Sequence, residues 1–269
     1  MKTSAIKKYA SVFRTSFKQE KDAWVNHLIR GIFFMLMCYM LFELWGYIYG
    51  RGTGQIIKGF SLVQMLWYLI ITETIQCSTR TTAIIREFST EIKSGSIAYK
   101  LNKPYNYYLY TISSFMARSM FILIFIVPIA IIMGFCFVGI PITFVWEQIL
   151  PCSLTILIAI FLSWSLYGIV GQIAFWTQEA APFAWIVQKF MMLFGLLFPV
   201  DFFPLWMQPI IRYSPIYSIM SGPATLVANF SWLGFLELFI SQLVWGIIIV
   251  GAGLLILKKG QKKVTSNGG

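Results

Sequence analysis

The sequence has little charge, a single histidine and no stretch that matches a known catalytic motif. Charged residues make up 12% of the 269 residues, about half the share of a typical soluble domain, so a soluble globular class is excluded. His27 is the only histidine, and no His-Glu-x-x-His, Gly-x-Ser-x-Gly or cysteine–histidine cluster occurs. A Gly-x-x-x-x-Gly-Lys-[Ser/Thr] loop, which would cradle the phosphates of ATP, is also missing. We therefore expect no catalytic, cofactor-binding or metal-binding residue on this chain.

Cysteine is scarce and is not arranged for metal binding or redox chemistry. The four cysteines, Cys38, Cys77, Cys136 and Cys152, lie in or beside apolar segments without Cys-x-x-Cys spacing. They are predicted to be small packed hydrophobes. A disulfide between Cys136 and Cys152, which flank one connection, stays open.

Apolar residues dominate what is present. They form 58% of the chain, and runs of roughly 20 residues, long enough to cross a bilayer, recur along it. We predict an all-α integral membrane protein with one transmembrane domain over residues 1–269. About 27 polar and basic residues precede the first apolar run and no small-residue cleavage site follows it, so it reads as a retained helix. Six spans are predicted at residues 29–49, 60–77, 108–139, 148–173, 181–200 and 232–257.

The basic residues are distributed unevenly between the two sides of the predicted membrane. Sixteen of the 21 Lys and Arg residues lie in residues 1–30, in the segment 79–105 or in the tail, whereas only Arg51, Lys58 and Arg212 lie on the other side. This bias places both termini and the 79–105 segment in the cytoplasm. The net charge of +11 therefore reflects membrane orientation, and we expect no nucleic-acid partner.

Residues 1–27 have the pattern of an amphipathic helix. Ile6, Tyr9, Phe13 and Phe17 recur at spacings near three and four, with basic residues between them. The pattern predicts a helix lying in the cytoplasmic interface, against membrane lipids. A solvated helical extension is the alternative.

Residues 200–231 are apolar but rich in proline. Pro199 and Pro204 begin a series of five prolines that argues against a seventh crossing, because proline interrupts the helical hydrogen-bond ladder. We predict a broken, re-entrant outer hairpin. Asp201 is an unusual residue for so apolar a segment.

The segment 79–105 is the longest polar stretch inside the chain, yet it has an apolar face. Ile84, Ile85, Phe88 and Ile92 fall on one side of a predicted helix, and Gly95 offers a stop that needs a positive φ. A second short helix then ends before Pro104. The pattern favours a docking element for a cytoplasmic partner; the alternative is a solvated loop that only joins two spans.

Two carboxylates within spans are candidates for a transport pathway. Glu73 either lines a conduit or pairs with a basic residue such as Lys189 or Arg118, because an unpaired charge in hydrocarbon is costly. Glu237 lies nearer a span end and can reach the headgroups. A proton-coupled carrier or channel that uses Glu73 and Glu237 is thus the alternative function.

The stretch "REFSTEIKSGSIAYKLNKPYNYY" resembles the segment that follows span two in permease subunits of type-2 ATP-binding-cassette exporters, in particular a poorly characterised six-span branch. The resemblance rests on an acidic residue, an Ile-x-Ser/Thr-Gly element and a Leu-x-Lys/Arg-Pro ending. The matching residues are Glu91, Ile92, Ser94, Gly95, Leu101, Lys103 and Pro104. The proline-rich outer segment is similar to the hairpin that follows span five in that family.

The resemblance implies that 79–105 is a coupling helix seated on a separate P-loop ATPase subunit, which binds the ATP and magnesium. A second permease, identical or related, would complete the transporter in a bacterial-type cytoplasmic membrane. The substrate would be a lipid, a hydrophobic peptide or a drug-like amphiphile, moved by alternating access. The residues expected to serve ATPase coupling are Glu87, Glu91, Lys93, Ser94, Gly95 and Lys100.

Overall fold

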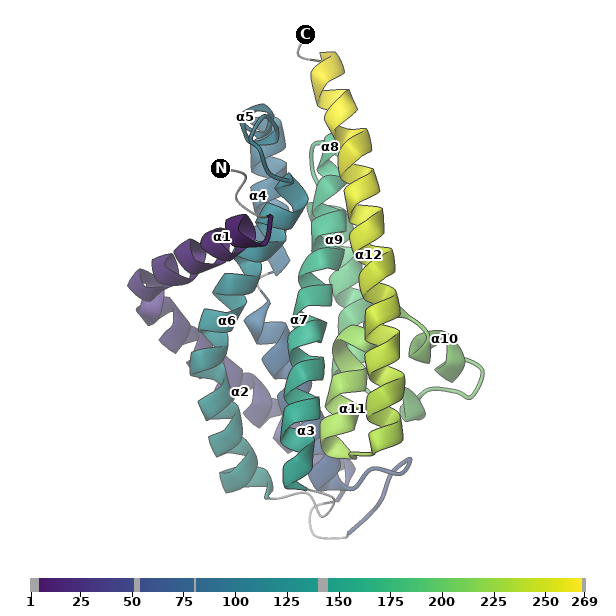
Figure 1. The fold of residues 1–269 in the computed structure, drawn as a ribbon. Coiled ribbons are helices and arrows are strands. Elements are labelled where there is room, and N and C mark those ends of the chain that lie inside the picture. The colour runs from purple at the N-terminus through teal and green to yellow at the C-terminus, as the bar shows by residue number, and fades with distance from the viewer. Residues whose placement is uncertain (1–4, 51–53, 80, 140–144, 268–269) are drawn as a thin grey trace.

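The computed structural model describes residues 5–50, 54–79, 81–139 and 145–267. Every regular element in this part of the chain is helical, so the predicted all-α class is confirmed. Lys2, Arg51 and Arg80, which contribute to the charge bias, lie outside it. The helices form an elongated bundle, and both ends of the chain lie at the same end of that bundle (Figure 1).

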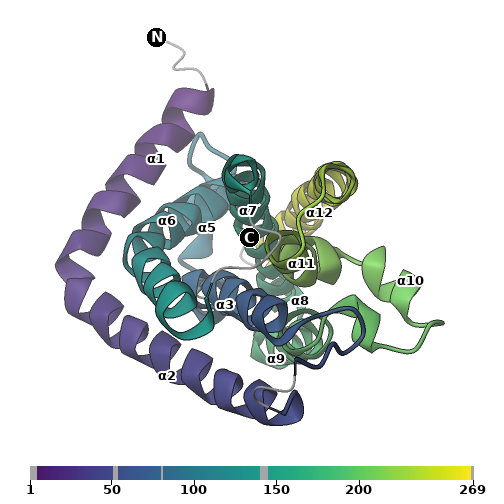
Figure 2. The ribbon, with the colours of Figure 1, turned by 90° about the horizontal axis from the view of Figure 1, so that it is seen from below.

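Two helices that meet at an elbow form the N-terminal part. α1 (Ala5–Gln19) is joined by the 3-10 turn η1 (Glu20–Ala23) to α2 (Trp24–Ile48). Figure 2 shows the two helices as arms that wrap one side of the bundle. The amphipathic helix is therefore shorter than the predicted 1–27, because residues 24–27 already belong to α2.

A buried polar contact lies at this elbow. Glu20 Oε2 is 3.2 Å from His27 Nε2, and Glu20 Oε1 is 3.6 Å from Nε of Arg118 on α6 (Tyr107–Met133). The imidazole also stacks on Phe125, with ring centroids 5.6 Å apart. The single histidine thus packs between α1, α2 and α6, where buried charges need such partners.

The next helix begins with a capping box and ends at an extended residue. Ser61 and Gln64 satisfy each other's backbone N–H groups at the start of α3 (Leu62–Ser78). Thr79 is extended, with φ −100° and ψ 111°, so α3 cannot run on into α4 (Thr81–Lys93). A short α5 (Ile97–Leu101) follows before α6.

The middle of the chain descends and returns through two long helices. α6 passes into a π-helical turn η2 (Gly134–Val138). After the 3-10 turn η3 (Trp146–Gln148), α7 (Ile149–Gln172) and the single turn α8 (Ala174–Thr177) return to the end that holds α4 and α5. α9 (Ala181–Met191) then leads into a second π-helical segment, η4 (Met192–Leu197).

The proline-rich segment folds as short helices. In order they are η5 (Val200–Phe202), α10 (Gln208–Arg212), η6 (Tyr217–Ser221) and α11 (Gly222–Ala228). α11 lies inside the bundle, with Ala224 and Ala228 fully buried, whereas α10 projects from its side (Figure 1). The long α12 (Trp232–Asn267) closes the fold and runs ten residues past the predicted limit of its span.

Four helical stretches are long and apolar enough to cross a membrane: 7–48, 107–138, 146–177 and 232–262. α3 and the stretch 181–197 have 17 residues each. At 1.5 Å per residue these two reach about 25 Å, short of the roughly 30 Å hydrocarbon core. The structure therefore supports an integral membrane protein, and the two shorter helices leave the count of six as a proposal.

Hydroxyl and indole groups tie the central helices together. Trp164 Nε1 on α7 donates to Ser119 Oγ on α6 at 2.7 Å, and this hydroxyl in turn donates to Ser78 O at the end of α3, also at 2.7 Å. The ring of Tyr108 sits in a slot between Gly168 and Gly253, where a Cβ would come within 2.8 and 2.3 Å of it. This packing holds α6 against α7 and α12.

Candidate functional site

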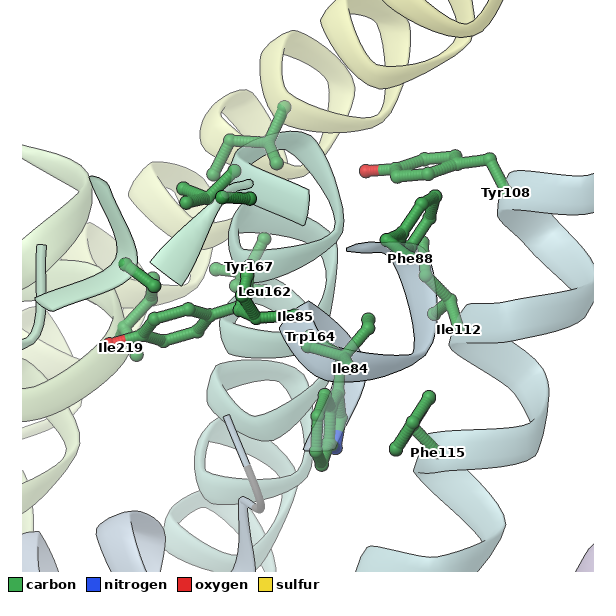
Figure 3. Packing of buried hydrophobic residues seen from close by; sticks show 14 of the residues in the cluster. Ile84, Ile85, Phe88, Tyr108, Ile112, Phe115, Leu162, Trp164, Tyr167 and Ile219 are labelled. Atoms are coloured by element: carbon green, nitrogen blue, oxygen red, sulfur yellow. The ribbon is translucent and has the colours of Figure 1, made fainter. Parts of the chain in front are cut away.

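The apolar face of α4 is covered by the chain itself. Ile84, Ile85 and Phe88 are at most 3% exposed and pack with Trp164 and Tyr167 of α7 (Figure 3). Phe88 lies directly on Gly171, where an added Cβ would be 2.7 Å from its ring. The expectation that this face is a surface left for a partner is therefore wrong. α6 and α7 extend beyond the end of α3 far enough to bury it.

Gly95 makes the turn between α4 and α5. Its φ is +72°, a conformation that L side chains rarely adopt. Around it, Ser94 Oγ lies 2.8 Å from Ser96 Oγ, and the Ser96 N–H points at the same Ser94 oxygen from 3.4 Å. The prediction that Gly95 ends the helix with a positive φ is thus confirmed.

Glu91 and Lys100 form an internal clamp. Lys100 donates to one carboxylate oxygen of Glu91, and Tyr107 Oη donates to the other at 2.7 Å. Glu87 Oε1 lies 3.7 Å from the same ammonium group. Burial lowers the pKa of Lys100, but Glu91 and Glu87 outweigh it and the net shift is upward. The clamp fixes α5 against α4 and the start of α6, so Glu91 is a structural residue and not an exposed contact.

Lys93, another predicted residue, lies at the rim of this element. Lys93 pairs with Glu179, which follows α8, and both side chains are 48% exposed. Burial raises the pKa of the Glu87 carboxyl, an effect that Lys100 opposes. The six residues were predicted together to serve ATPase coupling, with Gly95 making the turn. In the structure Glu87, Glu91 and Lys100 form the clamp, Lys93 forms an ion pair, and Ser94 and Gly95 lie in the turn.

The exposed tip of the element is polar, with one aromatic residue. Ser94, Gly95, Ser96 and Asn102 are exposed. Tyr99 is 69% exposed, and the Lys103 ammonium lies 4.1 Å from its ring centroid and donates to its hydroxyl at 2.6 Å. Sequence analysis missed Tyr99, although a tyrosine on the polar side of an amphipathic helix is a usable signal.

The base of the same element is bound to the N-terminal helix. Lys8 Nζ donates to Pro104 O at 3.1 Å, and the Asn106 N–H donates to Tyr9 Oη at 3.1 Å. Asn106 also caps α6, since its side chain accepts from the Leu109 N–H at 3.2 Å. α1 therefore positions the start of α6 and the end of the loop that carries α5.

The candidate conduit residue Glu73 is buried in α3, at 4% exposure. Within the described part of the chain it has no hydrogen bond or ion pair. The expected pairing partners are engaged elsewhere: Arg118 contacts Glu20, and Lys189 lies over the ring of Trp185. Glu237 is exposed on α12, so the structure gives these two carboxylates different surroundings on different helices.

The outer hairpin is held by α3 and by its own polar residues. Asp201 Oδ1 lies 3.7 Å from Arg212 Nη2, which accounts for a carboxylate in this apolar segment. Pro199 precedes η5, and the carbonyl of Pro204 accepts from the Met207 N–H at 2.9 Å.

The link from the hairpin to α3 is made by Tyr68. Its hydroxyl is hydrogen-bonded to Gly195 O at 2.6 Å and Phe198 O at 3.1 Å. These carbonyls belong to η4 and the residue after it, and the last carbonyls of a helix lack partners within it.

The cysteines are free thiols, so the open alternative of a Cys136–Cys152 disulfide is not realised. Cys152 is buried and Cys136 is exposed on η2. Among the described residues, no three His, Cys, Asp or Glu side chains come close enough together to hold a metal ion.

These features define a helical membrane protein with a polar element, held by the Glu91–Lys100 pair, at the end where α1 begins and α12 ends. A family model described as "ABC-2 family transporter protein" matches residues 34–268. The chain therefore belongs to the ABC-2 family of transporters and is a permease subunit, a component of membrane transport that is not itself catalytic. No curated protein matches the chain. The resemblance stated for residues 86–108 is thereby confirmed at the level of the family.

Proposed function

We propose that this chain is the transmembrane half of an ATP-dependent exporter driven by a separate ATPase subunit. Membership of the ABC-2 family supports an ATPase partner of that class, and the chain lacks a phosphate-binding loop of its own. ATP and magnesium would be bound by the partner. A second permease would complete the path, and alternating access would move a lipid, a hydrophobic peptide or a drug-like amphiphile.

The observation that carries this proposal is the exposed tip around Gly95. It is polar, it projects from the bundle next to the chain ends (Figure 1), and the clamp of Glu91 and Lys100 holds it rigidly. A rigid element can transmit a displacement of a bound partner, whereas a loose loop would absorb it. The interacting surface is thus assigned to Ser94, Ser96, Tyr99 and Lys103.

We further propose six crossings, with both termini and the tip in the cytoplasm of a bacterial-type cell. The predicted charge bias supports this orientation, because the basic N-terminal helix, α4, α5 and the end of α12 share one end of the bundle. α3, and α9 together with η4, would be the two remaining crossings. The bilayer would thin locally to match their shorter length.

The test is co-purification of an ATPase and measurement of its activity with Tyr99→Ala. Tyr99 is 69% exposed, and its hydrogen bond and cation–π contact in the described residues are both with Lys103, so truncation should leave the bundle intact. We expect the variant to insert in the membrane normally but to recover several-fold less ATPase. Tyr213→Ala is the matched control, because Tyr213 is 78% exposed on the proline-rich segment. Equal recovery of ATPase with both variants would refute the docking assignment.

A proton-coupled carrier remains the second candidate because Glu73 is buried without a partner in the described residues. Such a carboxylate can take up and release a proton. This function predicts transport by the chain alone, abolished by Glu73→Gln and independent of ATP. The exporter predicts that transport requires the ATPase whether or not Glu73 is present.

A further inference from the structure

A polar groove opens where α3 breaks from α4. Its volume is about 730 Å³, within the range of small-molecule sites. Its lining combines the start of α2, the end of α3 and one side of α4: Arg30, Gln76, Cys77, Thr79, Thr82, Ala83, Arg86, Glu87, Thr90 and Glu91. A second groove of about 390 Å³, between α4 and α9, shares Thr82, Arg86 and Thr90 with it.

Two arginines line the groove. Arg86 is exposed and has no hydrogen bond or ion pair to any residue that the structure describes. Arg30 Nη1 donates to Cys77 O at 2.9 Å, which places its guanidinium at the end of α3 and facing the groove. Glu87 and Glu91 both face Lys100, which offsets one of the two carboxylates, so these five side chains together keep a net positive charge.

Hydroxyl groups lie beside the free arginine. Thr82 and Thr90 stand one turn before and one turn after Arg86 on the exposed stripe of α4, and all three line both grooves. A guanidinium flanked by hydroxyl donors suits the oxygens of a phosphate, to which charge-assisted hydrogen bonds are strong.

In the proposed orientation the groove would lie near the cytoplasmic membrane interface. Arg30 belongs to α2, whose outer face beside it is apolar and exposed, as at Ile29 and Phe33. Trp24, six residues earlier, is 55% exposed, as expected of an aromatic residue at the headgroup level. A ligand with its anionic group in the groove could therefore lay an acyl chain along α2.

We infer that this groove binds the anionic, phosphate-type headgroup of an amphiphile, with Arg86 and Arg30 as the recognising groups. The inference rests on the proposed function and narrows its substrate class to anionic amphiphiles. The binding itself involves the permease alone.

The experiment titrates the purified, detergent-solubilised chain with phosphatidylglycerol and, separately, with phosphatidylcholine, and counts bound lipid by native mass spectrometry. We expect phosphatidylglycerol to bind more tightly, and Arg86→Gln to weaken it about tenfold, as the loss of charged hydrogen bonds implies. Arg14→Gln is the matched control: Arg14 is an exposed arginine of α1 that lines neither groove. It should bind phosphatidylglycerol as the unmodified chain does.

Competition by inorganic phosphate distinguishes recognition of a free phosphate group from recognition of a whole lipid. Displacement at millimolar phosphate means that the headgroup alone is recognised, and failure to displace means that the acyl chain is required; both support the groove. Equal binding of the two lipids, or equal weakening by Arg86→Gln and Arg14→Gln, would overturn it. Because no ATPase is present, a negative result here leaves the Tyr99 experiment unaffected, and failure at Tyr99 leaves this one unaffected.

Discussion

Replacing Glu91 with glutamine should loosen the α4–α5 element without unfolding the bundle. Glutamine keeps the volume of the side chain and can still accept from Tyr107 Oη, which donates to Glu91 at 2.7 Å. It removes the charge that pairs with Lys100. The apolar face of α4 stays packed on α7, so the change is confined to the tip.

The expected cost follows from the burial of the pair. The Glu91 and Lys100 side chains are 11% and 29% exposed, so water screens them less than it screens a surface pair. Hydrogen bonds to charged groups contribute about 1.5–3 kcal/mol, and some solvent reaches the ammonium. We take about 2 kcal/mol for the local opening, which corresponds to a factor of about 30 in the opening equilibrium.

Amide hydrogen exchange measures that opening directly. In Glu91→Gln, amides of residues 93–103 should exchange about 30-fold faster, while those of α7 keep their rates. Lys93→Gln is the control, because its pair with Glu179 is 48% exposed on both sides. A surface pair of this kind contributes less than about 1 kcal/mol, so we expect at most about a fivefold effect.

A double-mutant cycle provides the refutation. If Glu91 and Lys100 act through each other, Lys100→Gln should add little once Glu91 is already glutamine. Fully additive effects, or unchanged exchange at 93–103 in Glu91→Gln, would show that the clamp does not hold the tip and would remove the rigidity argument.

Gly95→Val should reduce ATPase stimulation in the reconstituted complex, because a β-branched residue is strained at φ +72°; Gly95→Asn, which tolerates this region, should retain most of it, and equal loss in both would contradict the backbone explanation. Gly253→Ala should lower the midpoint of thermal unfolding, because its Cβ would lie 2.3 Å from the Tyr108 ring, and overpacking costs about 1–3 kcal/mol. Gly251→Ala, with nothing within 4 Å, should be nearly neutral, and a similar midpoint for the two variants would count against the slot.

The limits of the apolar helices could largely be predicted, because each is set by a local contrast in hydropathy. α9 begins at Ala181 and α12 at Trp232, as expected, and α7 begins one residue later than predicted. The end of α12 was missed. Beyond Leu257 the sequence becomes polar, which marks the membrane edge but does not require the helix to stop.

The roles of individual charged residues could be predicted less well. Glu91 meets Lys100 nine residues later and Tyr107 sixteen residues later, contacts that exist only because Gly95 reverses the chain between them. Glu20 meets Arg118 and His27 for a similar reason, since the elbow at η1 turns α1 across α6. Because sequence analysis does not show which residues these turns bring together, it predicts such buried charged side chains to be exposed contacts.

The apolar face of α4 shows why an amphipathic pattern cannot by itself identify a docking surface. The spacing of Ile84, Ile85 and Phe88 predicts that this face is buried. In this chain α7 buries it, with Gly171 against Phe88. A glycine facing a phenylalanine leaves no trace in hydropathy, because its contribution is the absence of a side chain. Since α7 covers the apolar face, the signal that remains for a partner is a large apolar residue outside that face. Tyr99 is such a residue, a large aromatic side chain left 69% exposed on the polar side of the element.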